Sequence, residues 1–182
     1  ALILATFPQA LRTAMKQCLI RYAPVKDTLG PLPEELLSAE PLVPSERNAY
    51  RFMPSDLNTW ERKFAEFLDD DTTGVVKWWH RNKPWRLESV CVPLPSGKAY
   101  FPDFVICLAG RKRGDGILLV ETKERVYDPL AEEKVEAEHK FYGRPLMLTL
   151  ENERFMSVRF NPHQRRNELD RIFSLDWAAG YE

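Results

Sequence analysis

The pattern of apolar and polar positions is clearest between Tyr100 and Lys123. Two apolar runs rich in β-branched residues, ending at Leu108 and at Lys123, flank a loop from Ala109 to Gly116 that is rich in glycine and arginine. Such a pattern predicts a β-hairpin. Side chains alternate faces along a strand, so Glu121 and Lys123 should share one face while Thr122 points away. Asp103 opens the first run and reaches the same face if the strands pair in the right register.

A second pattern, with apolar residues at helical spacing, predicts a helix from Ser55 or Asp56 to about Leu68. At 100° per residue Glu61 lies on the apolar face of this helix. A carboxylate on a buried face needs a partner. Alternatively, Glu61 sits at the edge of the face with its carboxylate in water.

The remaining patterns predict an α/β fold, with a mixed central sheet flanked by helices. We expect a helical segment over residues 1–23, an extended linker over 24–54, which contains six prolines, and one domain over 55–182. Within that domain, strands are expected near residues 75–79, 88–92, 146–150 and 155–160. Helices are expected from Asp128-Pro129 to about Tyr142, and from Asn161-Pro162 through Phe173 and Leu175.

The polar residues of the predicted hairpin suggest a chemistry. Two crowded carboxylates, Asp103 and Glu121, repel each other, and one pKa would rise unless a cation lay between them. Lys123 supplies one positive charge, and a divalent metal would supply the rest. This combination is typical of metal-assisted phosphodiester hydrolysis.

These residues also carry a family resemblance. Pro102-Asp103, a spacer of seventeen residues and then Glu121-Thr122-Lys123 resemble the PD-(D/E)xK nuclease signature. The wider stretch, over residues 57–145, resembles the C-terminal endonuclease region of type III restriction subunits and related helicase–nuclease proteins.

The resemblance implies a restriction-endonuclease-like αβββαβ core and DNA endonuclease activity that depends on Mg²⁺, for which Mn²⁺ would substitute. Asp103 and Glu121, joined by Glu61 and the Thr122 carbonyl, would hold the metal. Lys123 would orient or deprotonate the attacking water. Related nucleases also place a polar residue of the following helix near the scissile phosphate, and Lys134 is the candidate here. A lysine that snorkels past the core edge is the alternative.

Contacts to DNA are expected mainly from the stretch between Lys77 and Arg86, where basic side chains alternate with three tryptophans. Cationic groups neutralise phosphates and aromatic faces stack on bases. The candidates are Lys77, Arg81, Asn82 and Lys83. The alternative is that a tryptophan belongs to the core and the charges flank a loop. Arg111-Lys112-Arg113, at the predicted hairpin tip, are expected to be solvated.

Composition limits the setting. The formal net charge is −1, so any DNA affinity must come from local patches. Three scattered cysteines favour a reduced, cytoplasmic location. No apolar run is long enough to cross a bilayer. The chain lacks a Walker-type loop, so an ATP-driven motor would be fused or separate, and double-strand cleavage would favour a dimer.

Two other functions fit the same residues. The first is a catalytically silent nuclease-like module that binds DNA or a partner protein. The second is an ordinary surface group of salt bridges on an unrelated α/β domain. The complete Asp103, Glu121 and Lys123 set and its strand context favour the nuclease.

Overall fold

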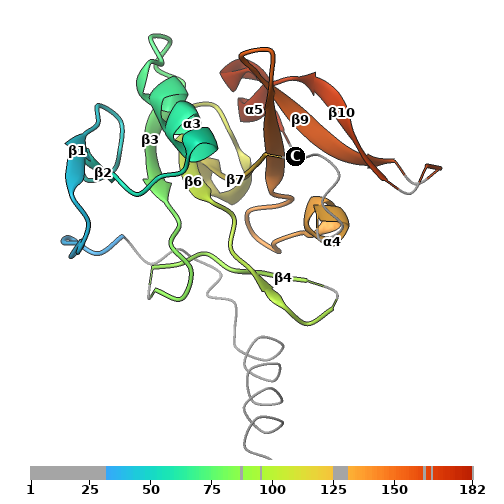
Figure 1. Ribbon diagram of the computed structural model, residues 1–182, viewed down its shortest axis with the longest axis horizontal. Coiled ribbons are helices and arrows are strands. Elements are labelled where there is room, and N and C mark those ends of the chain that lie inside the picture. Colours follow the sequence, from blue (N-terminus) through green and yellow to red (C-terminus); the bar gives the residue numbers. More distant parts are fainter. Residues whose placement is uncertain are drawn as a thin grey trace, which may run out of the picture.

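The computed structural model describes residues 32–86, 88–94, 96–124, 131–161, 163–164 and 166–181 (Figure 1). The helix predicted over residues 1–23 and the helix start predicted at 128–129 lie outside these ranges. The described elements, in chain order, are β1 (Leu42–Pro44), β2 (Phe52–Pro54), α3 (Thr59–Asp69), β3 (Val76–Arg81), β4 (Val92–Pro93), β5 (Ala99–Tyr100), β6 (Phe104–Leu108), the 3-10 turn η1 (Arg113–Gly116), β7 (Ile117–Lys123), α4 (Ala131–Glu136), β8 (Leu146–Glu151), β9 (Arg154–Asn161), β10 (Arg166–Ile172) and α5 (Leu175–Ala179).

Among the described residues, six strands form one mixed sheet in the order β10-β9-β8-β7-β6-β3. β7 and β8 run parallel, whereas the other neighbours are antiparallel. The α/β class and the hairpin of β6 and β7 are confirmed. The hairpin pairs Phe104 with Val120, so the next position outward sets Asp103 beside Glu121.

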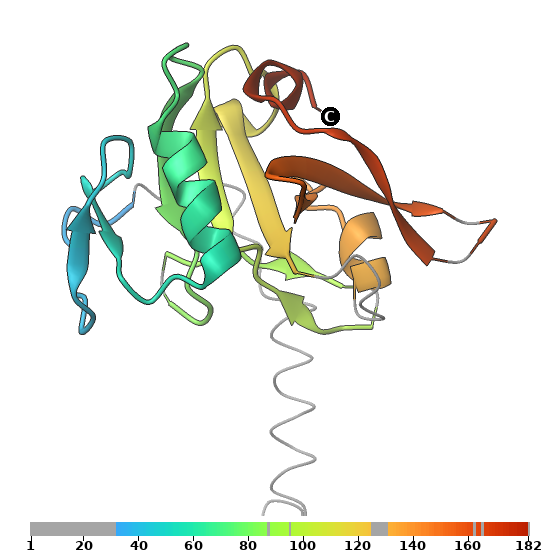
Figure 2. The same cartoon turned by 45° about the horizontal axis from the view of Figure 1, so that its top comes forward.

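Helix α3 covers one face of this sheet (Figures 1 and 2). Phe64 and Leu68 of the helix are fully buried against the strands. The helix begins at Thr59, later than predicted, because Asn58 and not Ser55 or Asp56 is its N-cap. The Asn58 side chain accepts from the Glu61 backbone N–H at 2.9 Å, and Glu61 accepts from the Asn58 N–H at 3.2 Å. This capping box satisfies two backbone donors at once.

Residues 42–54, predicted to be part of an extended linker, instead form the hairpin of β1 and β2. Met53 is buried in the main core, and the Ala49 N–H donates to the Trp79 carbonyl of β3 at 2.9 Å. Pro44 and Pro54 end their short strands, where a missing backbone donor is tolerated. The folded unit therefore includes residues before 55.

The C-terminal helix predicted from Asn161 is wrong. β10 occupies Arg166–Ile172, and α5 is short and capped by Ser174. Asn161 Oδ1 accepts from the backbone N–H groups of His163 and Gln164, as an N-cap side chain does in a first helical turn. Here the same bonds form the turn between β9 and β10. Asn161 is therefore a local signal that is compatible with both a helix N-terminus and a turn.

Two other predicted elements are shorter than expected. Helix α4 ends at Glu136 rather than near Tyr142, because His139 Nδ1 accepts from the Phe141 and Tyr142 N–H groups and turns the chain. The strand predicted over 88–92 is reduced to β4, which pairs only with β5.

The hairpin tip also differs from the prediction, since Arg111 is buried rather than solvated. Its guanidinium donates to the carbonyls of Ile117, Tyr142 and Tyr181. Arg111 therefore ties the tip to the C-terminal segment. Of the three basic residues at the tip, Lys112 is exposed and Arg113 is half-buried.

Candidate active site

The end of β7 holds the most buried carboxylate of the predicted site. The Glu121 residue is 3% exposed, and its Oε1 atom is 3.0 Å from Lys123 Nζ and 2.8 Å from Lys134 Nζ. Burial raises the pKa of Glu121, as does the nearby Asp103 charge, while the two lysines oppose this rise. One oxygen of Glu121 thus pairs with two ammonium groups, that of Lys123 from β7 and that of Lys134 from α4.

Asp103 lies just before β6 and is held by its neighbour strand. Its Oδ2 atom accepts from both the backbone N–H and the hydroxyl of Thr122, each at 2.9 Å. Its Oδ1 atom is 3.3 Å from Arg81 Nη1. The register therefore brings Asp103 beside Thr122 at the end of β7, with one of its carboxylate oxygens bonded to Thr122.

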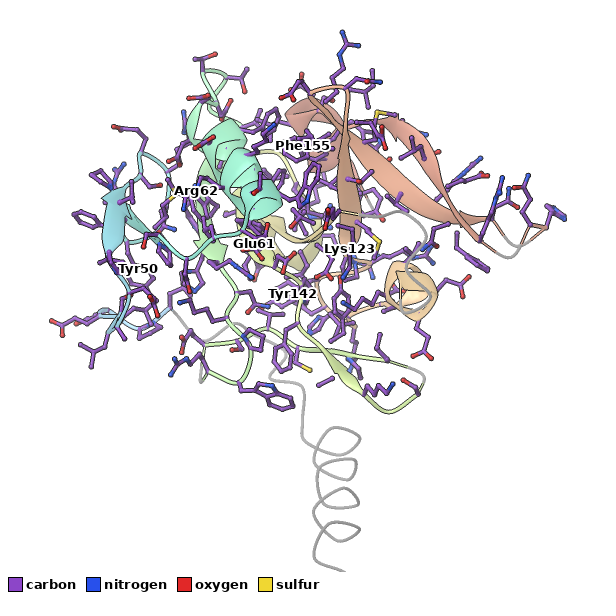
Figure 3. The ribbon with its side chains drawn as sticks, in the orientation of Figure 1. Tyr50, Glu61, Arg62, Lys123, Tyr142 and Phe155 are labelled. Atoms are coloured by element: carbon purple, nitrogen blue, oxygen red, sulfur yellow. The ribbon has the colours of Figure 1, made fainter. Side chains whose placement is uncertain are left out.

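Glu61 lies in the first turn of α3 and is 6% exposed, so the sequence correctly predicted a buried carboxylate with a partner. The partner is Arg81, whose Nη2 atom is 2.6 Å from Glu61 Oε1. The pKa of Glu61 is raised by burial and by Asp103, while Arg81 lowers it. Figure 3 shows the positions of Glu61 on α3 and of Lys123 at the end of β7.

Arg81 connects these groups. Besides the two salt bridges, its Nη1 atom donates to the Asp103 carbonyl at 2.8 Å. Its side chain is only 17% exposed, and the Glu61 and Asp103 side chains are exposed by 8% and 17%. Sequence reasoning assigned Arg81 to DNA, whereas here it joins helix α3 to the Asp103 strand.

The other predicted DNA contacts separate into two groups. Lys83 and Lys134 lie near the carboxylates, where Lys83 pairs with Asp56 at 3.1 Å and Lys134 pairs with Glu121. Lys77 is exposed at the far end of β3, about 13 Å from Arg81 along the strand. Asn82 is 1% exposed, and its amide bonds Val90 and Pro102, so it is a structural residue.

Sequence reasoning missed Tyr100, at the end of β5. The residue is 2% exposed, and its buried hydroxyl group interacts with the Glu121 side chain. Lys134 Nζ lies 4.7 Å from the ring centroid. Burial raises the pKa of Tyr100 well above 10, as do the Glu121 and Asp103 charges. A phenol in an apolar run, three residues before Asp103, was the available signal.

An open pocket of about 310 Å³ adjoins Glu61. Its lining consists of Asp56, Leu57, Glu61, Arg81, Lys83, Pro84 and Arg86. Three of these residues are cationic and two are anionic, so the pocket offers net positive charge next to the carboxylates. Arg86 and Asp56 were not predicted to contribute.

The carboxylates offer oxygen donors of the kind that Mg²⁺ prefers. Asp103, Glu121 and the Thr122 carbonyl come from two adjacent strands and fit this requirement. Within the described residues, however, no group of three or more His, Cys, Asp or Glu side chains is arranged to hold a metal ion. Glu61 faces Arg81, so it can join a metal only if Arg81 moves.

No family model, curated protein or solved structure matches the chain. The family resemblance therefore rests on the motif residues themselves. In the part of the chain that is described, none of the helices is both long and apolar enough to cross a membrane.

Proposed function

We propose that the chain is a divalent-metal-dependent DNA endonuclease domain of the PD-(D/E)xK type, belonging to a restriction or helicase–nuclease system. The observation that carries the proposal is the cluster at the end of β7, where Asp103 bonds Thr122 and its charge acts on Glu121, while Lys123 and Lys134 pair with the same Glu121 oxygen. A buried carboxylate with a raised pKa in a polar site is a feature of functional sites.

The order of elements also supports the proposal. The succession α3, β3, β6, β7, α4 and β8, with small β4 and β5 between β3 and β6, agrees with the αβββαβ core that the resemblance implies. Pairing is antiparallel from β3 to β6 and from β6 to β7, then parallel from β7 to β8. Helix α4 follows β7 in the chain, and its Lys134 pairs with Glu121 near the C-terminal end of β7.

Asp103, Glu121 and the Thr122 carbonyl are the groups that would hold Mg²⁺ or Mn²⁺, with Glu61 joining once Arg81 leaves it. When bound, the cation would supply Lewis-acid stabilisation and a water of lowered pKa. Lys123, 3.0 Å from Glu121, is placed to orient that water and to offset charge that develops on the phosphate.

The charge balance of the site suggests how the lysines could pass from pairing with carboxylates to binding a phosphate. Without a metal, Arg81, Lys123 and Lys134 neutralise the carboxylates of Glu61, Asp103 and Glu121. Additional positive charge between Asp103 and Glu121 would replace this neutralisation and release ammonium groups toward a phosphate. Lys134 then acts as a phosphate contact, which is the role that the resemblance gives it.

The test is cleavage of DNA in Mg²⁺ or Mn²⁺ by the wild type, Asp103→Asn and Glu121→Gln, with Lys77→Ala as control. We expect both carboxylate variants to lose cleavage and metal binding together, because each removes an anionic oxygen ligand. Lys77→Ala, an exposed lysine at the far end of β3, should cleave like the wild type. Full cleavage by either carboxylate variant would refute the assignment.

A silent nuclease-like module that binds DNA or a protein is the second candidate. It is favoured by the salt bridges that already neutralise Glu61 and Glu121 and by the lack of a three-ligand metal group among the described residues. It predicts DNA binding that Asp103→Asn leaves undiminished, with no cleavage in any metal. A fused or separate motor is a further proposal from the resemblance, and cleavage of both strands of a duplex with one site per chain would favour a dimer.

A further inference from the structure

Next to the candidate site, a tryptophan is presented to solvent. Trp85 is 67% exposed and lies in the loop between β3 and β4. Its backbone φ is +63°, a conformation that bulky residues rarely adopt. Its ring lies 4.9 Å from that of Phe101, two residues before Asp103. An aromatic ring in a strained, exposed position beside a site suggests a binding role.

The loop that carries Trp85 is fixed at both ends. Asn82 closes it through two hydrogen bonds to Val90, at 2.9 Å and 2.8 Å, and ties it to the Pro102 carbonyl at 2.7 Å. Inside the loop, the Ser89 hydroxyl donates to the Lys83 carbonyl and accepts from the Arg86 N–H. Trp85 is therefore held in a defined position relative to Asp103.

Cationic residues lie close to Trp85 in the sequence. Lys83 and Arg86 line the 310 Å³ pocket together with Arg81 and Glu61. The Lys83–Asp56 pair is 36% and 42% exposed, and such surface pairs contribute little, so Lys83 can exchange Asp56 for a phosphate. Positive charge around an exposed aromatic face is the combination that binds single strands.

We propose that Trp85 stacks on an unpaired base while Lys83 and Arg86 bind the adjacent backbone phosphates. This deepens the nuclease proposal and rests on it, because it makes the substrate of the Asp103–Glu121 site a single-stranded nucleic acid or a single-stranded end. In a continuous duplex both faces of each base are already stacked on neighbouring bases, so no base is available to stack on the Trp85 ring.

The test measures binding of a labelled oligonucleotide of about 15 nucleotides by fluorescence anisotropy, without metal and at about 0.1 M salt. Single-stranded DNA, single-stranded RNA and duplex DNA are compared. The variants are Trp85→Ala and Trp85→Phe. The matched control is Phe52→Ala, which removes another exposed aromatic ring, 47% exposed, from β2. Circular dichroism checks that every variant is folded.

We expect the wild type to bind a single strand more tightly than the duplex. Trp85→Ala should weaken single-strand binding by about 5- to 150-fold, the range for one base stacked on an aromatic ring. Duplex binding should change by less than about two-fold, Trp85→Phe should retain most of the affinity, and Phe52→Ala should bind like the wild type. Comparison of the two single strands then shows whether the loop prefers DNA or RNA.

Three results would overturn the inference. They are unchanged single-strand binding by Trp85→Ala, equal losses on single strand and duplex, and no nucleic-acid binding by the wild type, which would leave the loop to a protein partner. The two proposals fail separately. Unchanged binding by Trp85→Ala together with metal-dependent cleavage lost in Glu121→Gln rejects only the inference. Trp85-dependent binding without any cleavage rejects the nuclease.

Discussion

Replacing Arg81 by glutamine tests the electrostatic account of the site. The change removes a salt bridge of 2.6 Å to Glu61, another of 3.3 Å to Asp103 and a hydrogen bond of 2.8 Å to the Asp103 carbonyl. Glu61 stays buried, and it still accepts a hydrogen bond from the Asn58 N–H at 3.2 Å. The variant therefore leaves a buried carboxylate facing Asp103 without its cation.

Breaking a buried ion pair by removing one partner costs about 3–5 kcal/mol. The side chains of Arg81 and Glu61 are 17% and 8% exposed, so solvent screens the pair little. For a domain of this size, 1 kcal/mol corresponds to about 2–4 °C in the melting temperature. We therefore expect Arg81→Gln to melt about 6–20 °C lower at neutral pH.

The loss should depend on pH. Burial already raises the pKa of Glu61, and Arg81 opposes the rise, so removing Arg81 raises that pKa further. A raised pKa in the folded state gives stability that is present below the unfolded pKa and lost as pH rises through the folded pKa. The deficit of Arg81→Gln should thus be smallest near about pH 4, below the unfolded pKa of a glutamate, and larger near about pH 7.

Urea unfolding at these pH values measures the effect, with Arg159→Gln as the matched control. The Arg159–Glu168 bridge is 2.8 Å long, but the Arg159 side chain is 62% exposed. Its loss should change stability by less than about 1 kcal/mol. Equal stabilities of the two variants, or a deficit of Arg81→Gln that does not grow with pH, would refute the reasoning.

Three further predictions concern His80, the metal and Asn82. Burial lowers the pKa of His80 to about 4, so stability is lost as pH falls from 6.5 toward 4, and His80→Gln should remove up to about 3 kcal/mol of this loss in urea titrations. Mg²⁺ at ten times its Kd should stabilise the wild type by about 1.4 kcal/mol, seen as a rise of about 3–5 °C in a thermal-shift assay, but should leave Asp103→Asn unchanged. Asn82→Ala leaves buried backbone groups of Val90 and Pro102 without their hydrogen-bond partner, so it should lower the unfolding free energy by about 2–4 kcal/mol. Limited proteolysis should then cut the Trp85 loop early.

The parts of the fold that the sequence predicted are those with strong local patterns. The β6–β7 hairpin follows from two apolar runs around a glycine-rich loop, and the buried position of Glu61 follows from helical periodicity. The C-terminal strand was missed because the bonds made by Asn161 are shared by a helix N-terminus and a turn. Tertiary pairing of β10 with β9 then decides between them.

For the candidate site, the sequence indicated which residues take part better than it indicated the contacts that they make. The motif indicated Asp103, Glu121 and Lys123, but not that Arg81 would bridge Glu61 and Asp103, because that contact joins a helix to a strand end across 20 residues. Asn82 resembled a DNA contact because it follows a basic run. Its burial depends on Val90 and Pro102, which no periodicity connects to it.

The central claim is that Lys123 acts in a metal-dependent hydrolysis at the Asp103–Glu121 site. The direct measurement is single-turnover cleavage of DNA by Lys123→Ala and the wild type at saturating Mn²⁺, with Mn²⁺ binding followed by electron paramagnetic resonance. We predict that Lys123→Ala still binds Mn²⁺, since both carboxylates remain, but cleaves about 10²- to 10⁴-fold more slowly. Cleavage at the wild-type rate, or no cleavage by the wild type, would contradict the account.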